Sequence, residues 1–335
     1  MNKKIIRYAF CIITLLLILL GVCFVSLKTG TIGYSAREVI ASLFGRHDSI
    51  AFSIIWNLRF QRIVLGLAVG GGLSLVGVML QAMFRNPLVE PYTLGISGGA
   101  CLGVSLSLGL RGSFAILGNA SLAISGFLGS LLVVCFLYSI SLRKGLLELK
   151  GVLLSGVMVS YISSSLIMLV MALSKTEDLH GIVMWTMGYL GKADWKLTQL
   201  AALCSFLGLI TACFLSVRLN ALSLGEEQAA YLGLNVERLK KIIFLMASLL
   251  TGVFVSVCGI VGFVGLVVPH FMRIVCGRDH RILLLSSYLA GAIFLISCDI
   301  AARTIILPLE LPVGVITGII GGSVFIYALG KKRYL

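Results

Sequence analysis

The ionisable residues with the most informative spacing are arginines and one aspartate that stand beside or inside apolar runs. Arg59 and Arg62 are three residues apart just before one such run, and Asp299 and Arg303 are four residues apart within another. Residues four apart share one face of a helix, so Asp299 and Arg303 can form an ion pair. Charges in apolar segments are usually functional or paired, and mutual neutralisation is the plain alternative for this pair.

His270 is a second candidate for chemistry, because it follows Pro269 inside the apolar stretch GFVGLVVPHFMR (262–273). A histidine there could relay protons or bind a metal, but a lone histidine near a helix kink is more often a hydrogen-bonded structural residue. The sequence has no HExxH motif and no recognisable nucleophile–base pairing, which disfavours an intramembrane enzyme. It also has no GxxxxGK[ST] loop, so the chain is not itself a P-loop ATPase.

The composition indicates a membrane protein. Of the 335 residues, 59% are hydrophobic and 12% are charged, with a mean hydropathy of +1.07. A soluble globular domain carries roughly 25% charged residues, so this chain cannot cover itself with polar surface in water, and we expect it to lie in membrane lipid. The nine cysteines stand in or beside apolar segments without a CxxC pair, and we interpret them as packing residues rather than disulfides.

About ten apolar runs are long enough to cross a bilayer as helices. They cover residues 5–27, 61–82, 93–109, 115–140, 151–173, 195–217, 241–258, 262–276, 282–302 and 313–330. The first run shows no small-residue cleavage site and is long for a signal peptide, so we expect a retained helix. The predicted fold class is an all-α polytopic membrane protein with one transmembrane domain over 1–335. Arg59-x-x-Arg62 and Arg238-x-x-Lys241 give a weak echo between its two halves.

The distribution of basic residues predicts the orientation. An even number of spans puts both termini on one side, and placing that side in the cytoplasm leaves most of the 27 Lys and Arg residues inside. This agrees with the positive-inside rule. The net charge of +14 therefore reflects topology, and without aromatic residues interleaved among basic ones it does not indicate nucleic-acid binding.

A polar turn, FRNPLVEP (84–91), follows the second apolar run. Pro87 and Pro91 cannot continue a helix, so the chain must turn there. A tight polar turn at the cytoplasmic end of a span could form part of a gate, because its backbone must be satisfied by water or protein. An ordinary short loop is the alternative.

The longest cytoplasmic interruption is SVRLNALSLGEEQAAYLGLNVERLKK (216–241). Residues 221–224 and 226–232 could each form a short helix, ended by Gly225 and Gly233. Glu226 and Glu227 would lie in the first turn of the second helix, where negative charge is favourable. Such short helices are not stable alone, so we expect them to dock on the bundle or on a cytoplasmic partner. A solvated loop is the alternative.

Four segments together resemble the FecCD/BtuC-type permease subunits of ABC importers for iron–siderophore complexes, heme and cobalamin, and the resemblance covers nearly the whole chain. They are LRFQRIVLGLAVGGGLSLVGVMLQAMFRNPLVEPYTLGISGGA (58–100), LSLGEEQAAYLGL (222–234), GIVGFVGLVVPHFMR (259–273) and DIAAR…ELPVGVITGIIGG (299–322). The resemblance implies about ten transmembrane helices in the type II ABC importer permease fold. It also implies alternating access without catalysis in this subunit.

The same resemblance implies a set of partners in the cytoplasmic (inner) membrane. Two ATPase subunits would dock inside and one extracytoplasmic substrate-binding protein outside, with a second permease copy or a related chain completing a dimer. ATP and Mg²⁺ would be bound by the ATPase subunits, with no cofactor in this chain. We expect a ferric siderophore as cargo, with heme or cobalamin as the alternatives.

The resemblance also assigns roles to residues by position. Arg59, Arg62 and Arg303 match outer arginines that receive acidic residues of the binding protein, and such charge-assisted pairs can fix register. The family's R-L-P-R is here Arg59-Phe60-Gln61-Arg62, and without the proline the helix is free to continue outward. ATPase coupling is assigned to Leu222, Leu224, Gly225, Glu226, Glu227, Ala230, Leu232 and Gly233. The cytoplasmic gate is assigned to Asn86 and Leu88 in FRNPLVEP, and to Leu149 and Lys150 in the turn before the fifth span.

An ion-coupled secondary transporter is the alternative from another class. Such a protein needs buried acids near the middle of the membrane as coupling sites. The acidic residues of this chain lie in loops or near the ends of spans, and only Asp299 is a candidate. The sequence therefore favours the ATP-driven importer.

Overall fold

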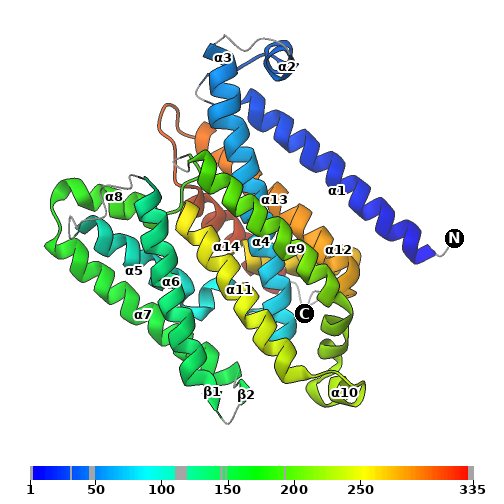
Figure 1. The fold of residues 1–335 in the computed structure, drawn as a ribbon. Coiled ribbons are helices and arrows are strands. Elements are labelled where there is room, and N and C mark those ends of the chain that lie inside the picture. Colours follow the sequence, from blue (N-terminus) through cyan, green and yellow to red (C-terminus); the bar gives the residue numbers. More distant parts are fainter. Residues whose placement is uncertain are drawn as a thin grey trace.

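The structure is a computed structural model that describes residues 3–30, 32–44, 50–109, 119–143, 146–147, 149–191 and 194–330. Helices make up nearly all of it (Figure 1). Two strands of two residues each, β1 (Leu142–Arg143) and β2 (Leu146–Leu147), pair antiparallel. The helices are α1 (Lys3–Lys28), α2 (Ala36–Phe44), α3 (Ile50–Ser53), the π-helix η1 (Ile54–Phe60), α4 (Gln61–Phe84), the 3-10 helix η2 (Pro91–Leu94), α5 (Ile96–Gly109), α6 (Asn119–Ser141), α7 (Leu149–Leu173), α8 (Thr176–Thr186), α9 (Trp195–Leu224), α10 (Glu226–Tyr231), α11 (Val236–Cys258), α12 (Val264–Cys276), α13 (His280–Thr304) and α14 (Val313–Gly330).

The expected all-helical membrane fold is confirmed. Within the described residues, 7 helices are long and apolar enough to cross a membrane, and the shorter apolar helices α5, α12 and α14 account for the remaining expected runs. Residues 115–118 of the fourth expected run lie outside the described part of the chain. Helices α2 and α8 were not expected, because they are too short and too polar to register as spans.

Helix α4 forms the centre of the bundle and packs against α9, α11, α12 and α13. Small residues permit this packing: a Cβ on Gly70 would collide with the backbone carbonyl of Gly291 on α13, and a Cβ on Gly291 would collide with that of Gly70. Close backbone approach of this kind is how helices associate in lipid, where apolar side chains gain little from meeting one another. The glycine-rich stretch 66–77 is therefore a packing surface.

Helices α5, α6 and α7 form a second group beside this centre, and α1 lies along α13 on the opposite side (Figure 1). The apolar spans of α1 and α7 are only 17% and 11% buried within the chain. Their side chains consequently face outward, where lipid or another membrane subunit must cover them.

The boundaries of three segments correct the expectations from the sequence. The second span does not start at residue 61 as expected, because α3, η1 and α4 form one continuous rod from Ile50 to Phe84, as the missing proline allows. Helix α9 continues to Leu224, so 221–224 is its last turn rather than a separate short helix. Helix α7 begins at Leu149, so Leu149 and Lys150 lie in its first turn and not in the loop before it.

The interpretation of the cysteines is wrong for one pair. The structure joins Cys11 of α1 to Cys276 at the end of α12 as a disulfide, while the other seven cysteines are free. The two residues are 265 positions apart and meet because the start of α1 crosses the end of α12, where Arg7 also donates to the Val275 carbonyl over 2.7 Å. Nothing in the spacing of the cysteines along the sequence indicates this crossing.

Candidate functional sites at the two ends of the bundle

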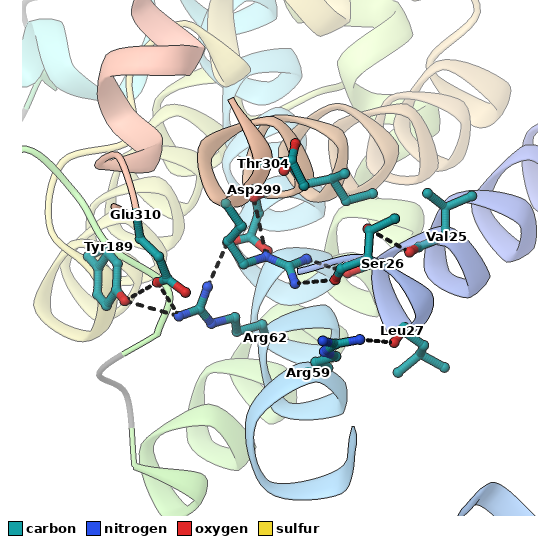
Figure 2. A network of polar contacts seen from close by, with 12 residues as sticks. Val25, Ser26, Leu27, Arg59, Arg62, Tyr189, Asp299, Thr304 and Glu310 are labelled. Carbon is teal, nitrogen blue, oxygen red and sulfur yellow. Dashed lines mark hydrogen bonds and ion pairs between the residues drawn. The ribbon is translucent and has the colours of Figure 1, made fainter. Parts of the chain in front are cut away.

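Arg59, Arg62 and Arg303 lie close enough at one end of the bundle for their charges to repel one another, and we call this the arginine end. Figure 2 labels Arg59 and Arg62 in it. Arg59 is 5% exposed and lies in η1, the wide-turn segment before α4. Its guanidinium donates to the Leu27 carbonyl over 2.6 Å and to the Ile32 carbonyl, and it stacks over the ring of Tyr34. Arg59 therefore binds the last turn of α1 and the chain that follows it.

Arg303 binds the same region from α13. It is 4% exposed and forms an ion pair with Asp299 over 2.9 Å, as the spacing of four residues predicts. Its other nitrogens donate to the Ser26 hydroxyl over 2.9 Å and to the Thr29 carbonyl over 3.1 Å. Asp299 thus orients Arg303 toward the end of α1.

Arg62 faces a different part of the arginine end. It forms an ion pair with Glu310 over 2.6 Å, lies 3.8 Å from Asp299, and donates to the Tyr189 hydroxyl over 3.0 Å. The Tyr189 hydroxyl also donates to Glu310. Burial opposes the charge of Glu310, but the hydrogen bonds from Arg62 and Tyr189 outweigh it and lower the pKa of this carboxyl. The network ties α4 to the segments before α9 and before α14.

The structure thus brings the three arginines together but gives each of them a partner inside the chain. Their assignment to docking stays a prediction, and docking through them would require exchange of an internal partner for a carboxylate of the binding protein. The sequence indicated Asp299 as a partner but missed Glu310 and Tyr189. Glu310 is 248 positions from Arg62, and only its place in a polar turn between two apolar runs could have suggested it.

The opposite end carries the short helix α10, and we call it the α10 end (Figure 1). Helix α10 is bounded by Gly225 and Gly233, which adopt φ of +135° and +81° that other residues rarely take. Three large apolar side chains project outward around it: Leu224 is 62% exposed, Tyr231 90% and Leu232 67%. The sequence assignment missed Tyr231, although this residue lies within the motif LSLGEEQAAYLGL (222–234).

Of the other residues assigned to coupling, some are buried or paired within the chain and the rest are exposed. Leu222 is fully buried in the core, Gly225 is also buried, and Glu227, Ala230 and Gly233 are exposed. Glu226 accepts from Lys240 of α11 over 2.7 Å, and Lys240 also pairs with Glu237 over 3.0 Å. These contacts hold α10 against the start of α11.

A second anchor joins the end of α9 to α13. The Asn220 side chain donates to Asp279 over 2.7 Å and accepts from the His280 backbone amide over 2.8 Å. Burial opposes the charge of Asp279, but the hydrogen bonds from Asn220 and the Arg281 amide outweigh it and lower its pKa. These part-buried polar contacts connect the region around α10 to both α11 and α13.

The turn at residues 84–91, which we call the gate turn, lies near this end. Arg85 ends α4 in the left-handed conformation, and the Asn86 side chain accepts from the Leu88 amide over 2.9 Å. The Leu88 side chain is exposed. Leu149 packs against the core and Lys150 is exposed, both on α7. The structure therefore describes all four residues assigned to the gate, on two separate elements.

Glu90 is a buried carboxyl in the gate turn that the sequence did not single out. Burial raises the pKa of Glu90 to about 7, although the backbone amide of Phe263 donates to it and partly offsets the effect. Its Oε2 atom is buried and lacks a hydrogen-bond partner within the described residues. Phe263 itself adopts a φ of +67°, so a strained backbone segment faces this carboxyl.

Among the described residues, the His270 ring has no partner for the structural hydrogen bond that its position suggested. Its ring makes edge contacts with Phe271 and Phe325 instead. Over the part of the chain that the structure describes, no three His, Cys, Asp or Glu residues gather in a way that could hold a metal ion.

This architecture, a many-helix bundle with a compact Gly-bounded helix at one end, defines a polytopic membrane protein. A sequence model of the FecCD transport family matches residues 16–331, and the chain therefore belongs to this family of ABC importer permeases. Its members are membrane transport subunits and not catalytic enzymes.

Three curated relatives illustrate the range of the family. The hemin transport permease HmuU of Yersinia pestis is 35% identical over 97% of this chain and 95% of its own length. The vitamin B12 import permease BtuC of Klebsiella pneumoniae is 38% identical over 83% of both chains. A probable iron chelatin permease of Helicobacter pylori is 36% identical over 84% of this chain and 83% of its own. The chain is thus an importer permease subunit for a metal chelate, heme or cobalamin.

Solved structures support the same fold. A metal-chelate type ABC transporter in an inward-facing conformation matches with a TM-score of 0.84 and 29% identity over 97% of this chain and 99% of its own. PsaBC of Streptococcus pneumoniae matches with a TM-score of 0.58 at 14% identity, which shows a likeness of fold alone.

Proposed function

We propose that this permease imports a ferric siderophore or a similar iron chelate. The observation that carries the proposal is the match to a metal-chelate type transporter along nearly the full length of both chains. The iron chelatin permease of Helicobacter pylori supports the same cargo class.

The α10 end is proposed as the site where ATPase subunits act. Exposed Leu224, Tyr231 and Leu232 would fill an apolar depression in the partner, as aromatic and aliphatic anchors do at interfaces. The anchors at Lys240 and Asn220 would carry the movement of α10 into the bundle. Two ATPase subunits would bind ATP and Mg²⁺, so this chain needs no cofactor of its own.

The arginine end is proposed as the outer surface that receives the substrate-binding protein. Both termini would then lie in the cytoplasm, as the positive-inside rule favours. Purified Arg59→Gln should bind the binding protein at least tenfold more weakly while still assembling with the ATPase. Unchanged affinity for the binding protein would mean that Arg59 serves only its internal contacts with α1.

The gate turn and the first turn of α7 are proposed as the cytoplasmic constriction. A second permease copy, or a related chain, would complete the translocation path between two subunits. The outward-facing apolar side chains of α7, whose span is 11% buried within the chain, support a membrane partner there.

The cargo is tested by uptake in cells that carry or lack this chain, with its native partners present. Labelled ferric siderophores, heme and cobalamin are supplied separately, and a strain with an inactive partner ATPase serves as control. The proposal expects loss of ferric siderophore uptake in both defective strains. Loss of heme uptake alone would replace the siderophore with heme.

Heme is the second candidate because of one observation. The Yersinia pestis hemin permease aligns over 97% of this chain, further than the vitamin B12 permease of Klebsiella pneumoniae, which aligns over 83%.

A further inference from the structure

A cavity of about 880 Å³ lies at the α10 end, between the gate turn, α12 and the start of α13. Three arginines line it: Arg85 after α4, Arg273 on α12 and Arg278 after α12. His270, one turn before Arg273, and His280 at the start of α13 complete the polar part of the wall. The cavity thus gathers cationic and imidazole groups from segments that are up to 195 positions apart.

The Asp279 carboxylate lies beside the wall and attracts a positive charge on His280, but it is not part of the lining. None of the described residues that line the cavity is a carboxylate, and no ion pair within the described chain involves Arg85, Arg273 or Arg278. The carboxylates nearby along the chain have other partners: Asp279 binds Asn220, Glu226 binds Lys240 and Glu90 binds the Phe263 amide. Arg273 and Arg278 are close enough for their charges to repel one another.

A concave wall with several unpaired guanidiniums favours an anion. Guanidinium groups donate two parallel hydrogen bonds to phosphate oxygens, and several of them together suit a group with more than one charged oxygen. Basic pockets between transmembrane helices at the cytoplasmic side bind phosphate headgroups of lipids. The lining residue Ile274 and its neighbour Val275 have exposed apolar side chains, against which an acyl chain can lie.

We propose that this cavity binds a phosphate group, carried by an anionic phospholipid or present as free phosphate. The ligand would join the gate turn through Arg85 to α12 through Arg273 and to the α12–α13 connection through Arg278. Leu224, the last residue of α9 before α10, lies in the same wall. Occupancy would therefore stiffen the region between the gate turn and the coupling helix.

The test uses the full-length chain purified in detergent, with native mass spectrometry as the readout. The probes are phosphatidylglycerol, phosphatidylcholine and inorganic phosphate. Arg273→Gln and Arg278→Gln remove lining charges, and Arg278 is exposed, so its replacement leaves the packed interior unchanged. Arg281→Gln is the matched control, because Arg281 is an exposed arginine of the same end that does not line the cavity.

The expected result is that phosphatidylglycerol is retained over phosphatidylcholine, and about tenfold less by Arg273→Gln and Arg278→Gln, as when one charge-assisted hydrogen bond is lost. Arg281→Gln should match the unmodified chain. Retention of inorganic phosphate with the same dependence on Arg273 and Arg278 would support free phosphate as the source.

Two results would overturn the proposal. In the first, neither phosphate probe distinguishes the unmodified chain from the two lining variants. In the second, the variants retain both probes normally but lose affinity for the ATPase subunit in a separate binding measurement, which would make the cavity a protein contact. Because the readout is lipid or phosphate retention, both results are distinguishable from a wrong cargo assignment.

Discussion

At the arginine end, Arg59, Arg62 and Arg303 are bound to carbonyls and carboxylates of the same chain, whereas at the α10 end Tyr231 and Leu232 project outward. The cations around the neighbouring cavity also lack ion-pair partners within the described residues. At the arginine end, the buried charged side chains are paired within the chain. At the α10 end, apolar and cationic side chains are left for a partner or a ligand to cover.

This difference bears on the proposed roles of the two ends. A buried network of ion pairs is expensive to disrupt, because each partner that is left behind is an uncompensated charge. The arginine end therefore fixes α1, α4, α13 and the segment before α14 relative to one another. The α10 end is anchored at its base by Lys240 and Asn220 but presents an uncovered surface, as a site of partner docking requires.

The largest expected effect is a loss of stability when the ion-pair network of the arginine end is disrupted. Asp299→Asn removes the carboxylate that binds Arg303 and lies beside Arg62, and leaves both cations buried. We expect a loss of about 3–5 kcal/mol in the free energy of unfolding, measured by thermal and denaturant unfolding of the purified chain. Asp194→Asn is the control, because Asp194 is exposed and makes no capping bond. Equal stability of the two variants would contradict the internal role of this network.

The second prediction removes the exposed side chains of the α10 end without unfolding the chain. Tyr231→Ala with Leu232→Ala should weaken binding of the ATPase subunit at least 30-fold, since buried interface anchors contribute about 2 kcal/mol or more each. Tyr231→Phe keeps the ring and should bind normally. Binding is measured with the permease in lipid nanodiscs, alongside its thermal stability, which should not change. Normal ATPase affinity in the double variant would show that this surface is not the docking site.

The third prediction concerns the gate turn, where Glu90 is half-buried and its buried Oε2 atom has no hydrogen-bond partner within the described residues. Its folded pKa of about 7 lies above its ordinary value of 4.5, so the folded state holds the proton more tightly. Stability should therefore fall as the pH rises between these two values. Glu90→Gln should abolish that dependence and stabilise the chain by about 1–2 kcal/mol at pH 8. A variant that loses stability at pH 8 would show that the ionised carboxylate has a stabilising partner.

The smallest expected effect concerns Glu310 at the arginine end. Because the folded pKa is lowered, ionised Glu310 contributes stability above its ordinary value of 4.5, and this is lost as the pH falls through the folded pKa. Glu310→Gln should cost about 1 kcal/mol at pH 7, with the difference from the unmodified chain shrinking below about pH 4.5. Unfolding curves recorded from pH 7 to pH 4 measure it. A difference that grows on acidification would contradict the assigned pairing.

The sequence predicted the features that depend on residues close to one another in the chain. Apolar runs of about 20 residues determine spans, so the ten runs reappear as helices. A spacing of four residues sufficed for the Asp299–Arg303 pair, and the proline missing between Arg59 and Arg62 indicated the extended helix that the structure shows. The end of α9 was placed wrongly, because Asn220 and the residues after it continue a helix that only Gly225 stops.

The contacts that the sequence did not predict are those between distant segments. Arg62 and Glu310 meet across 248 positions, and Cys11 and Cys276 across 265, because of how α1, α4, α12 and the turn before α14 pack. The basic cavity has the same origin, since Arg85 follows α4 and Arg273 lies on α12. Tyr231 was missed for another reason: its exposure depends on how α10 sits on the bundle.

The most direct test of the account measures coupling between the α10 end and transport. Cells that lack the chain are complemented with the unmodified permease, Tyr231→Phe, or Tyr231→Ala with Leu232→Ala, and ATP-dependent uptake of a labelled ferric siderophore is compared at equal membrane abundance. The account predicts normal uptake with the first two and loss of uptake with the third. Equal uptake in all three would contradict the claim that this surface receives the driving subunit.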